Sequence, residues 1–141
     1  MNVSGIDGPV TVTAEGGSVQ LADVAGPVQV DTGGGSLLAS GITAATATVT
    51  SDGGPMQLIG RIGTLHAYTG GGSAAITLSA PPLSVTLDSD GGPATLAVPG
   101  GPYAVTADSD GGPETLNIAT NPAASRSITM SSGGGSLRIS P

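Results

Sequence analysis

Polar and apolar residues alternate along this chain in a pattern that repeats together with a pair of adjacent glycines. The glycine pair occurs seven times and is followed by Ser or Pro, and successive second glycines are 18 to 23 residues apart. A repeat of this length is typical of proteins built from stacked units. The seven pairs are Gly16-Gly17, Gly34-Gly35, Gly53-Gly54, Gly71-Gly72, Gly91-Gly92, Gly111-Gly112 and Gly134-Gly135.

Three columns of the repeat are apolar in every copy when the copies are aligned on the second glycine. The position between the first two columns is always polar, and such alternation with a period of two predicts a half-buried β-strand. Each repeat therefore predicts a strand, a Gly-Gly corner, a second strand and a looser corner. The columns contain Val10, Val28, Ala47, Leu65, Val85, Val105 and Ile128; Val12, Val30, Val49, Ala67, Leu87, Ala107 and Met130; and Leu21, Ala39, Leu58, Ile76, Leu96, Leu116 and Ile139.

These repeats predict one all-β domain over residues 1–141, a parallel β-solenoid of about seven rungs of 18–20 residues each. One repeat cannot bury its apolar face alone, so the rungs must stack. The alternative is an antiparallel β meander or sandwich, because Gly-Gly also forms hairpin turns. Glycine at the corners predicts a backbone with positive φ, which glycine adopts without a Cβ clash. No segment has apolar residues at helical spacing, so no helix is predicted.

Composition narrows the function classes. The chain has 25 Gly, 11 Pro, no Cys, no Lys and a net charge of −7. Nucleic-acid binding requires clustered cations, which are absent, and no apolar run reaches the length of a membrane helix. Disorder is disfavoured because 38% of the residues are hydrophobic and only 9% are charged. We expect no signal peptide in this sequence, and we expect Met1-Asn2 to be the start of an excised segment.

Carboxylates recur at equivalent positions late in the chain. Asp88 and Asp108 are 20 residues apart, as are Asp90 and Asp110. If rungs stack in chain order, each pair lies about 5 Å apart, and like charges at that separation are destabilising. A Ca²⁺ ion would relieve the repulsion; the alternative is a solvated acidic edge without a cation. Glu114 occupies a column that is otherwise apolar, and we expect a bulge that turns it outward.

Catalytic chemistry has few candidate groups. His66 is the only histidine, and there is no Lys or Cys to act as a nucleophile or base. We therefore predict that the protein is not an enzyme and has no catalytic or cofactor-binding residues. His66 and Tyr68 lie two residues apart and so project from the same face of a strand, with Arg61 nearby in the sequence. These three residues are a candidate recognition patch, because exposed aromatic and Arg side chains are good binding anchors.

The C-terminal half resembles the bacterial putative-adhesin repeat domain, also called toastrack-type. Residues 98–105 (VPGGPYAV) are similar to the proline-glycine-tyrosine-valine step of that family, and Ser127-Ile128-Thr129 with Gly135-Ser136-Leu137 to its closing strand pair. The looser repeat covers nearly the whole chain. The family commonly has Asp after the turn glycine, where this chain has Ser or Pro. The resemblance implies a stacked β fold, an extracytoplasmic or secreted setting, and no catalytic residues.

Two functions remain open. The first is a non-catalytic adhesion-type module of the cell envelope that binds a protein or an envelope glycan through the outer face of the solenoid. The second is a structural scaffold without a ligand, which assembles edge to edge with other copies because terminal rungs expose unpaired strand edges. Three identical SDGGP corners would also suit a designed rod.

Overall fold

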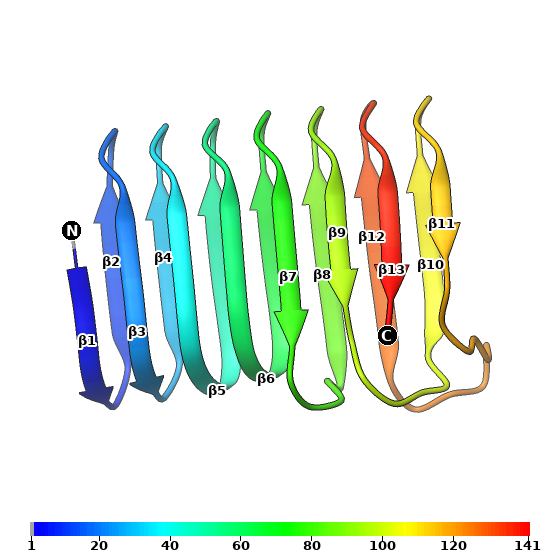
Figure 1. The fold of residues 1–141 in the computed structure, drawn as a ribbon, viewed down its shortest axis with the longest axis horizontal. Coiled ribbons are helices and arrows are strands. Elements are labelled where there is room, and N and C mark those ends of the chain that lie inside the picture. Colours follow the sequence, from blue (N-terminus) through cyan, green and yellow to red (C-terminus); the bar gives the residue numbers. More distant parts are fainter. Residues whose placement is uncertain (1) are drawn as a thin grey trace.

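The computed structural model describes residues 2–141 as thirteen β-strands without a helix (Figure 1). No helix in the described part of the chain is long and apolar enough to cross a membrane. The strands are β1 (Asn2–Asp7), β2 (Val10–Ala14), β3 (Val19–Ala25), β4 (Val28–Thr32), β5 (Leu37–Ser51), β6 (Met56–Thr69), β7 (Ala74–Leu78), β8 (Ser84–Ser89), β9 (Ala94–Ala97), β10 (Ala104–Ser109), β11 (Glu114–Leu116), β12 (Ser127–Ser132) and β13 (Leu137–Ser140).

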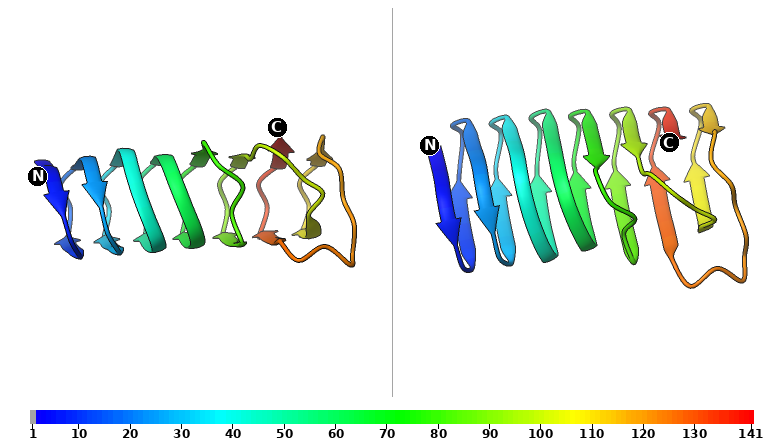
Figure 2. Two further views of the ribbon diagram at one scale, coloured as in Figure 1. Left: turned by 90° about the horizontal axis from the view of Figure 1, so that it is seen from below. Right: turned by 60° about the horizontal axis from the view of Figure 1, so that its bottom comes forward.

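The strands form two ladders that face each other across a narrow core (Figure 2). The first ladder has the order β1-β3-β5-β6-β7-β9-β13-β11, and the second has the order β2-β4-β5-β6-β8-β12-β10. The long strands β5 and β6 pass from one ladder to the other around a corner, so each contributes to both. Every strand pairing is parallel, which confirms the β-solenoid of about seven turns and excludes the antiparallel meander.

The three apolar columns of the sequence form the core. All of their members are buried except Val105, Ala107 and Leu116, which lie in β10 and β11 at one end of the stack. A fourth column, three residues before the second glycine, places hydroxyl groups inside the Gly-Gly corners. There Ser89 Oγ donates a hydrogen bond of 2.7 Å to the carbonyl oxygen of Gly92, and the same bond recurs in four other corners. These bonds satisfy carbonyl groups that the tight corner removes from the ladders.

The second glycine of each corner is required by close stacking of the rungs. The prediction of positive φ at the Gly-Gly corners is wrong for the second glycines, since none of the six from Gly35 onward has one, although Gly111, a first glycine, does. A Cβ on Gly72 would lie 2.1 Å from the carbonyl oxygen of Gly54 in the neighbouring rung, and the other five meet the same obstacle at 1.8–2.1 Å. The first glycine of a corner, such as Gly71, has open space instead. Stacked main chains therefore leave no room for a side chain at this column.

The last two rungs do not stack in the order of the chain. Strand β12 pairs with both β8 and β10, and β13 lies between β9 and β11. Figure 1 shows the C-terminal strands inside the stack, while β10 and β11 form its end. After β9 the chain skips the position of one rung and forms the end rung from β10 and β11. It then returns through residues 117–126 and fills the skipped position with β12 and β13 (Figure 2).

The exchanged order separates carboxylates that the chain order would bring together. Ser131 lies between Asp88 and Asp108 in the ladder, so these two carboxylates are two strands apart. Gly133 lies in the same way between Asp90 and Asp110. The Gly133 N–H donates to the carbonyl oxygen of Ser89, the residue before Asp90, and the Asp110 N–H donates to the carbonyl oxygen of Ser132, the residue before Gly133. The adjacent Asp pairs expected from the sequence are therefore absent, since that expectation assumed stacking in chain order.

The changed order of the last two rungs also determines the position of Glu114. It pairs in regular register with Leu137, without the bulge that the sequence suggested, and it is exposed. In chain order the same column would bury its carboxylate between Ala94 and Leu137, at a high desolvation cost. At the end of the stack, the inward column opens to solvent and the charge remains hydrated.

Tyr103 anchors the segment that carries the chain past the rung of β12 and β13, here called the inserted rung. Its side chain is fully buried, and its hydroxyl donates a hydrogen bond to the carbonyl oxygen of Pro99. Burial raises the pKa of the Tyr103 hydroxyl, an effect that the nearby Arg126 guanidinium partly offsets. The main chain of Tyr103 also bridges to Thr120 in the returning segment. The main chain of Tyr103 thus joins the two crossing segments, while its buried side chain bonds to Pro99 within the first of them.

Candidate functional site

The candidate patch of Arg61, His66 and Tyr68 is divided between two surfaces. His66 and Tyr68 lie in the half of β6 that belongs to the second ladder, and they point outward from it. Arg61 lies at the corner where β6 turns between the ladders. The two surface grooves lined by these residues have no lining residue in common. The bend of β6, which the sequence did not reveal, separates Arg61 from the other two.

The first groove, here called the His66 groove, crosses three strands of the second ladder. It has a volume of about 220 Å³. His66 lies in register between Thr48 and Thr86, and Tyr68 lies between Thr50 and Asp88. An aromatic ring, an imidazole, hydroxyl groups and a carboxylate therefore share one rigid surface. The lining residues are Thr48, Val49, Thr50, His66, Ala67, Tyr68, Thr86 and Asp88.

Tyr68 is held in place by a carboxylate of the next rung. Its hydroxyl donates a hydrogen bond of 3.2 Å to Asp90 Oδ2. This bond and the negative charge of Asp90 raise the pKa of the Tyr68 hydroxyl above its ordinary value, with smaller contributions from desolvation, Asp88 and Asp52. The phenol consequently stays neutral across the physiological range and can present its ring face and hydroxyl to a ligand.

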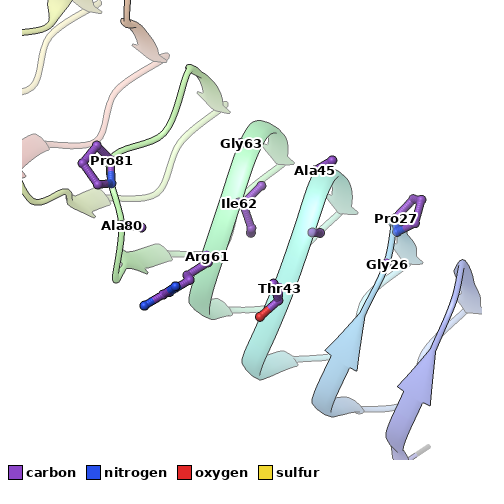
Figure 3. Close-up of a pocket in the computed structure, with 10 residues that line it drawn as sticks. Gly26, Pro27, Thr43, Ala45, Arg61, Ile62, Gly63, Ala80 and Pro81 are labelled. Atoms are coloured by element: carbon purple, nitrogen blue, oxygen red, sulfur yellow. The ribbon is translucent and has the colours of Figure 1, made fainter.

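The second groove, here called the Arg61 groove, lies at the edge of the solenoid opposite the Gly-Gly corners (Figure 3). Its volume is about 420 Å³. Pro27 and Pro81 stand at its two ends, and Arg61 lies at the end nearer Ala80. The groove exists because β5 and β6 turn this corner as continuous strands, whereas the flanking rungs turn it through proline-containing loops. Its lining residues are Gly26, Pro27, Thr43, Ala44, Ala45, Arg61, Ile62, Gly63, Ala80 and Pro81.

The four carboxylates proposed as calcium ligands do not form a cluster. Asp88 Oδ1 accepts a hydrogen bond of 2.8 Å from Ser131 Oγ, and Asp90 accepts the bond from Tyr68. Asp108 and Asp110 lie beyond the inserted rung. In residues 2–141 no group of three or more His, Cys, Asp or Glu side chains could hold a metal ion. The calcium interpretation thus loses the adjacent carboxylates on which it was based.

Sequence patterns did not indicate the residues that line the Arg61 groove around Arg61 itself. The walls of the Arg61 groove are Pro27 and Pro81, and its base includes the small residues Ala45 and Gly63. A signal was available, because the rungs on either side carry proline at the looser corner whereas the β5 and β6 rungs carry none there. Nothing in the spacing, however, indicated that β5 and β6 would turn the corner without a loop.

Comparison with known proteins gives no match: no family model, no curated protein and no solved structure matches this chain. Function is therefore inferred from the residues of the two grooves and from the resemblance described above.

Proposed function

We propose that this protein is a non-catalytic binding module of the bacterial cell envelope, which recognises its ligand through the outer face of the second ladder. The observation that carries the proposal is the His66 groove, in which Tyr68, the exposed His66 and Asp88 share one surface. The other tyrosine of the chain, Tyr103, is buried. Aromatic side chains that keep a polar tip are the usual anchors of recognition surfaces.

Rigidity supports recognition at this groove. Its side chains project from three neighbouring strands joined in register, so little conformational freedom remains to be lost on binding. The hydrogen bond from Tyr68 to Asp90 fixes the aromatic ring before a ligand arrives. The flanking Thr48, Thr50 and Thr86 supply hydroxyl groups that donate and accept hydrogen bonds. Such a surface fits a protein or an envelope glycan.

The envelope setting is supported by the resemblance of residues 98–105 and 127–137 to the toastrack-type adhesin repeat. In the structure these segments form the linker that carries Tyr103 and the inserted rung of β12 and β13. The non-catalytic assignment is supported by the neighbours of His66, which lies in register with two threonines.

The test is cosedimentation of the protein with purified peptidoglycan and with purified surface polysaccharide. We expect the natural protein and the Thr13→Ala variant, altered on the same face but outside the groove, to sediment with one of these fractions. Tyr68→Ala should lower the bound fraction about tenfold, because it removes the central anchor. Equal sedimentation of Tyr68→Ala would contradict the proposal, as would release of soluble fragments from the fraction. No sedimentation of the natural protein would exclude a glycan as the ligand.

Assembly of copies into a structural rod is the second candidate, and one observation favours it. Strands β10 and β11 each pair on one side only, so the end of the stack presents free main-chain groups. The same end carries features that oppose pairing: β11 has only three residues, and Glu114 places a charge in the apolar column. Light scattering over a hundredfold range of concentration distinguishes the candidates, since mass that grows with concentration would favour assembly.

A further inference from the structure

The Arg61 groove has structural features of a ligand site that are independent of the His66 groove. Pro27 and Pro81 lie three rungs apart, which corresponds to about 14 Å at the usual strand spacing. Between them the corners of β5 and β6 form a low surface of small side chains. The proline rings give the groove two rigid ends, so its shape does not depend on mobile side chains.

The hydrogen-bonded ladder between β6 and the next rung opens inside this groove. Main-chain bonds of 2.9 Å from Ser79 N to Gly60 O and of 2.7 Å from Leu83 N to Gly63 O close the ladder on either side. Between them no main-chain bond joins Arg61 or Ile62 to residues 80–82 among the described residues, and Pro81 and Pro82 have no N–H to donate. The main chain of β6 at Arg61 and Ile62 therefore has no ladder partner on this side.

Arg61 is the charged group of the groove. Its side chain is exposed, and within the described residues it has no hydrogen-bond or ion-pair partner. Most carboxylates of this acidic chain lie on the second ladder beside the Gly-Gly corners, at the opposite edge of the solenoid. They are Glu15, Asp31, Asp52, Asp88, Asp90, Asp108 and Asp110. Asp7, the carboxylate in the same column as Arg61, lies three rungs away in β1. A carboxylate ligand can form two parallel hydrogen bonds with the Arg61 guanidinium.

The direction of the groove favours a carbohydrate over a peptide. The groove runs from rung to rung across the strands, so it does not offer the continuous strand edge with which a peptide would pair. It offers instead the Thr43 hydroxyl for sugar hydroxyls and the surfaces of Pro27, Ala45 and Pro81 for the apolar faces of sugar rings. We propose that the Arg61 groove binds an acidic glycan, with the uronate carboxylate held by the Arg61 guanidinium. This site goes beyond the proposed function, because it is separate from the His66 groove.

The experiment is a titration of the full chain with tetragalacturonate, followed by calorimetry and by the amide chemical shifts of the ¹⁵N-labelled protein. We expect the largest shifts at residues 43–45, 61–63 and 80. Arg61→Gln should weaken the affinity about tenfold or more, because it removes a charge-assisted pair of hydrogen bonds. The matched control is Arg138→Gln, which removes an exposed arginine from the first ladder, outside both grooves, and should bind as the natural protein does.

Two further ligands test the chemistry of recognition. The methyl ester of tetragalacturonate keeps the sugar rings but lacks the charge, and it should bind as weakly as the acid binds to Arg61→Gln. Tetraglutamate keeps the charge but lacks the rings, and it should bind more weakly than tetragalacturonate. Equal binding of tetraglutamate would overturn the choice of a glycan. An affinity that is unchanged in Arg61→Gln, equal losses in both arginine variants, or shifts confined to residues 48–50 and 66–68 would overturn the site itself. The cosedimentation test uses Tyr68→Ala, so either proposal can fail without the other.

Discussion

The N-terminal and C-terminal parts of this solenoid follow the same repeat but stack differently. From β1 to β9 each rung lies on the rung before it, and each pairing joins neighbouring copies of the repeat. In the C-terminal part the final copy is inserted between the two copies that precede it. The apolar columns fit either arrangement, since every copy has apolar residues in the same places. The two arrangements differ in which charged positions they bring together, and we infer that sparse charges choose between stackings that the core leaves nearly equivalent.

The acidic column beside the corners illustrates this choice. In spatial order it contains Glu15, Gly33, Asp52, Gly70, Asp90, Gly133 and Asp110, so an acid and a glycine alternate over the whole length. In chain order Asp90 and Asp110 would be adjacent and the alternation would be lost. The inserted rung has no carboxylate in either outward column, because it carries Ser131 and Gly133 there. It therefore acts as a neutral spacer between two acidic rungs.

The largest expected effect is a difference in the loss of stability between a substitution in an interior rung and the same substitution in the end rung. Gly72→Ala places a Cβ 2.1 Å from the Gly54 carbonyl oxygen, and rungs on both sides prevent relaxation, so the free energy of unfolding should fall by about 3 kcal/mol. Gly112→Ala creates the same 2.1 Å contact with Gly135, but its rung has a neighbour on one side only and can move outward. Its cost should stay below about 1 kcal/mol.

Urea denaturation of the two variants measures this difference. Gly71→Ala is the control, since its Cβ would meet nothing within 4 Å, and it should leave stability nearly unchanged. Equal losses for Gly72→Ala and Gly112→Ala would show that the end rung is held as firmly as the interior.

A smaller effect concerns the order of the rungs. Thr129 is adjacent to Thr86 in the structure, whereas Thr106 lies two strands from Thr86. A cysteine pair at 86 and 129 should therefore form a disulfide, while a pair at 86 and 106, about 10 Å apart, should not. Combining Asp108→Ser, Asp110→Gly and Glu114→Leu removes the charges that disfavour chain order, and the 86–106 disulfide should then appear.

Mass spectrometry of the oxidised proteins distinguishes the two crosslinks. Thr106→Cys with Thr129→Cys serves as the control, because these residues are adjacent in both orders. If the 86–106 disulfide remained absent after the three substitutions, the linkers rather than the charges would determine the order.

The smallest effect lies at the boundary between the two parts, where Asp90 contacts Tyr68 on one side and the inserted rung on the other. Asp90→Asn removes the main cause of the raised Tyr68 pKa, so that pKa should fall toward its ordinary value of 10.0. Because the folded-state pKa is raised, the contribution of this bond to stability is complete below that ordinary value and is lost as the pH rises through the folded-state pKa.

Titration of phenolate absorbance in the ultraviolet follows this change. Asp108→Asn, in the end rung beyond Ser131, should leave the Tyr68 pKa unchanged. A Tyr68 pKa that did not respond to Asp90→Asn would contradict the hydrogen bond between the two side chains.

The sequence alone determined the number of rungs and their core, and it favoured the parallel solenoid over the antiparallel meander, because glycine pairs and apolar columns recur at nearly constant spacing. It also identified His66 and Tyr68 as outward neighbours, since alternation along one strand is a local property. The tertiary structure decided the order of the last rungs, the separation of Arg61 from His66 and the need for glycine at the corners. Each of these depends on which segments of main chain lie side by side in the stack. Several copies of the repeat have the same pattern, so they compete for the same position in the stack. Charge, linker path and close packing between rungs act on that competition, and no single repeat contains them.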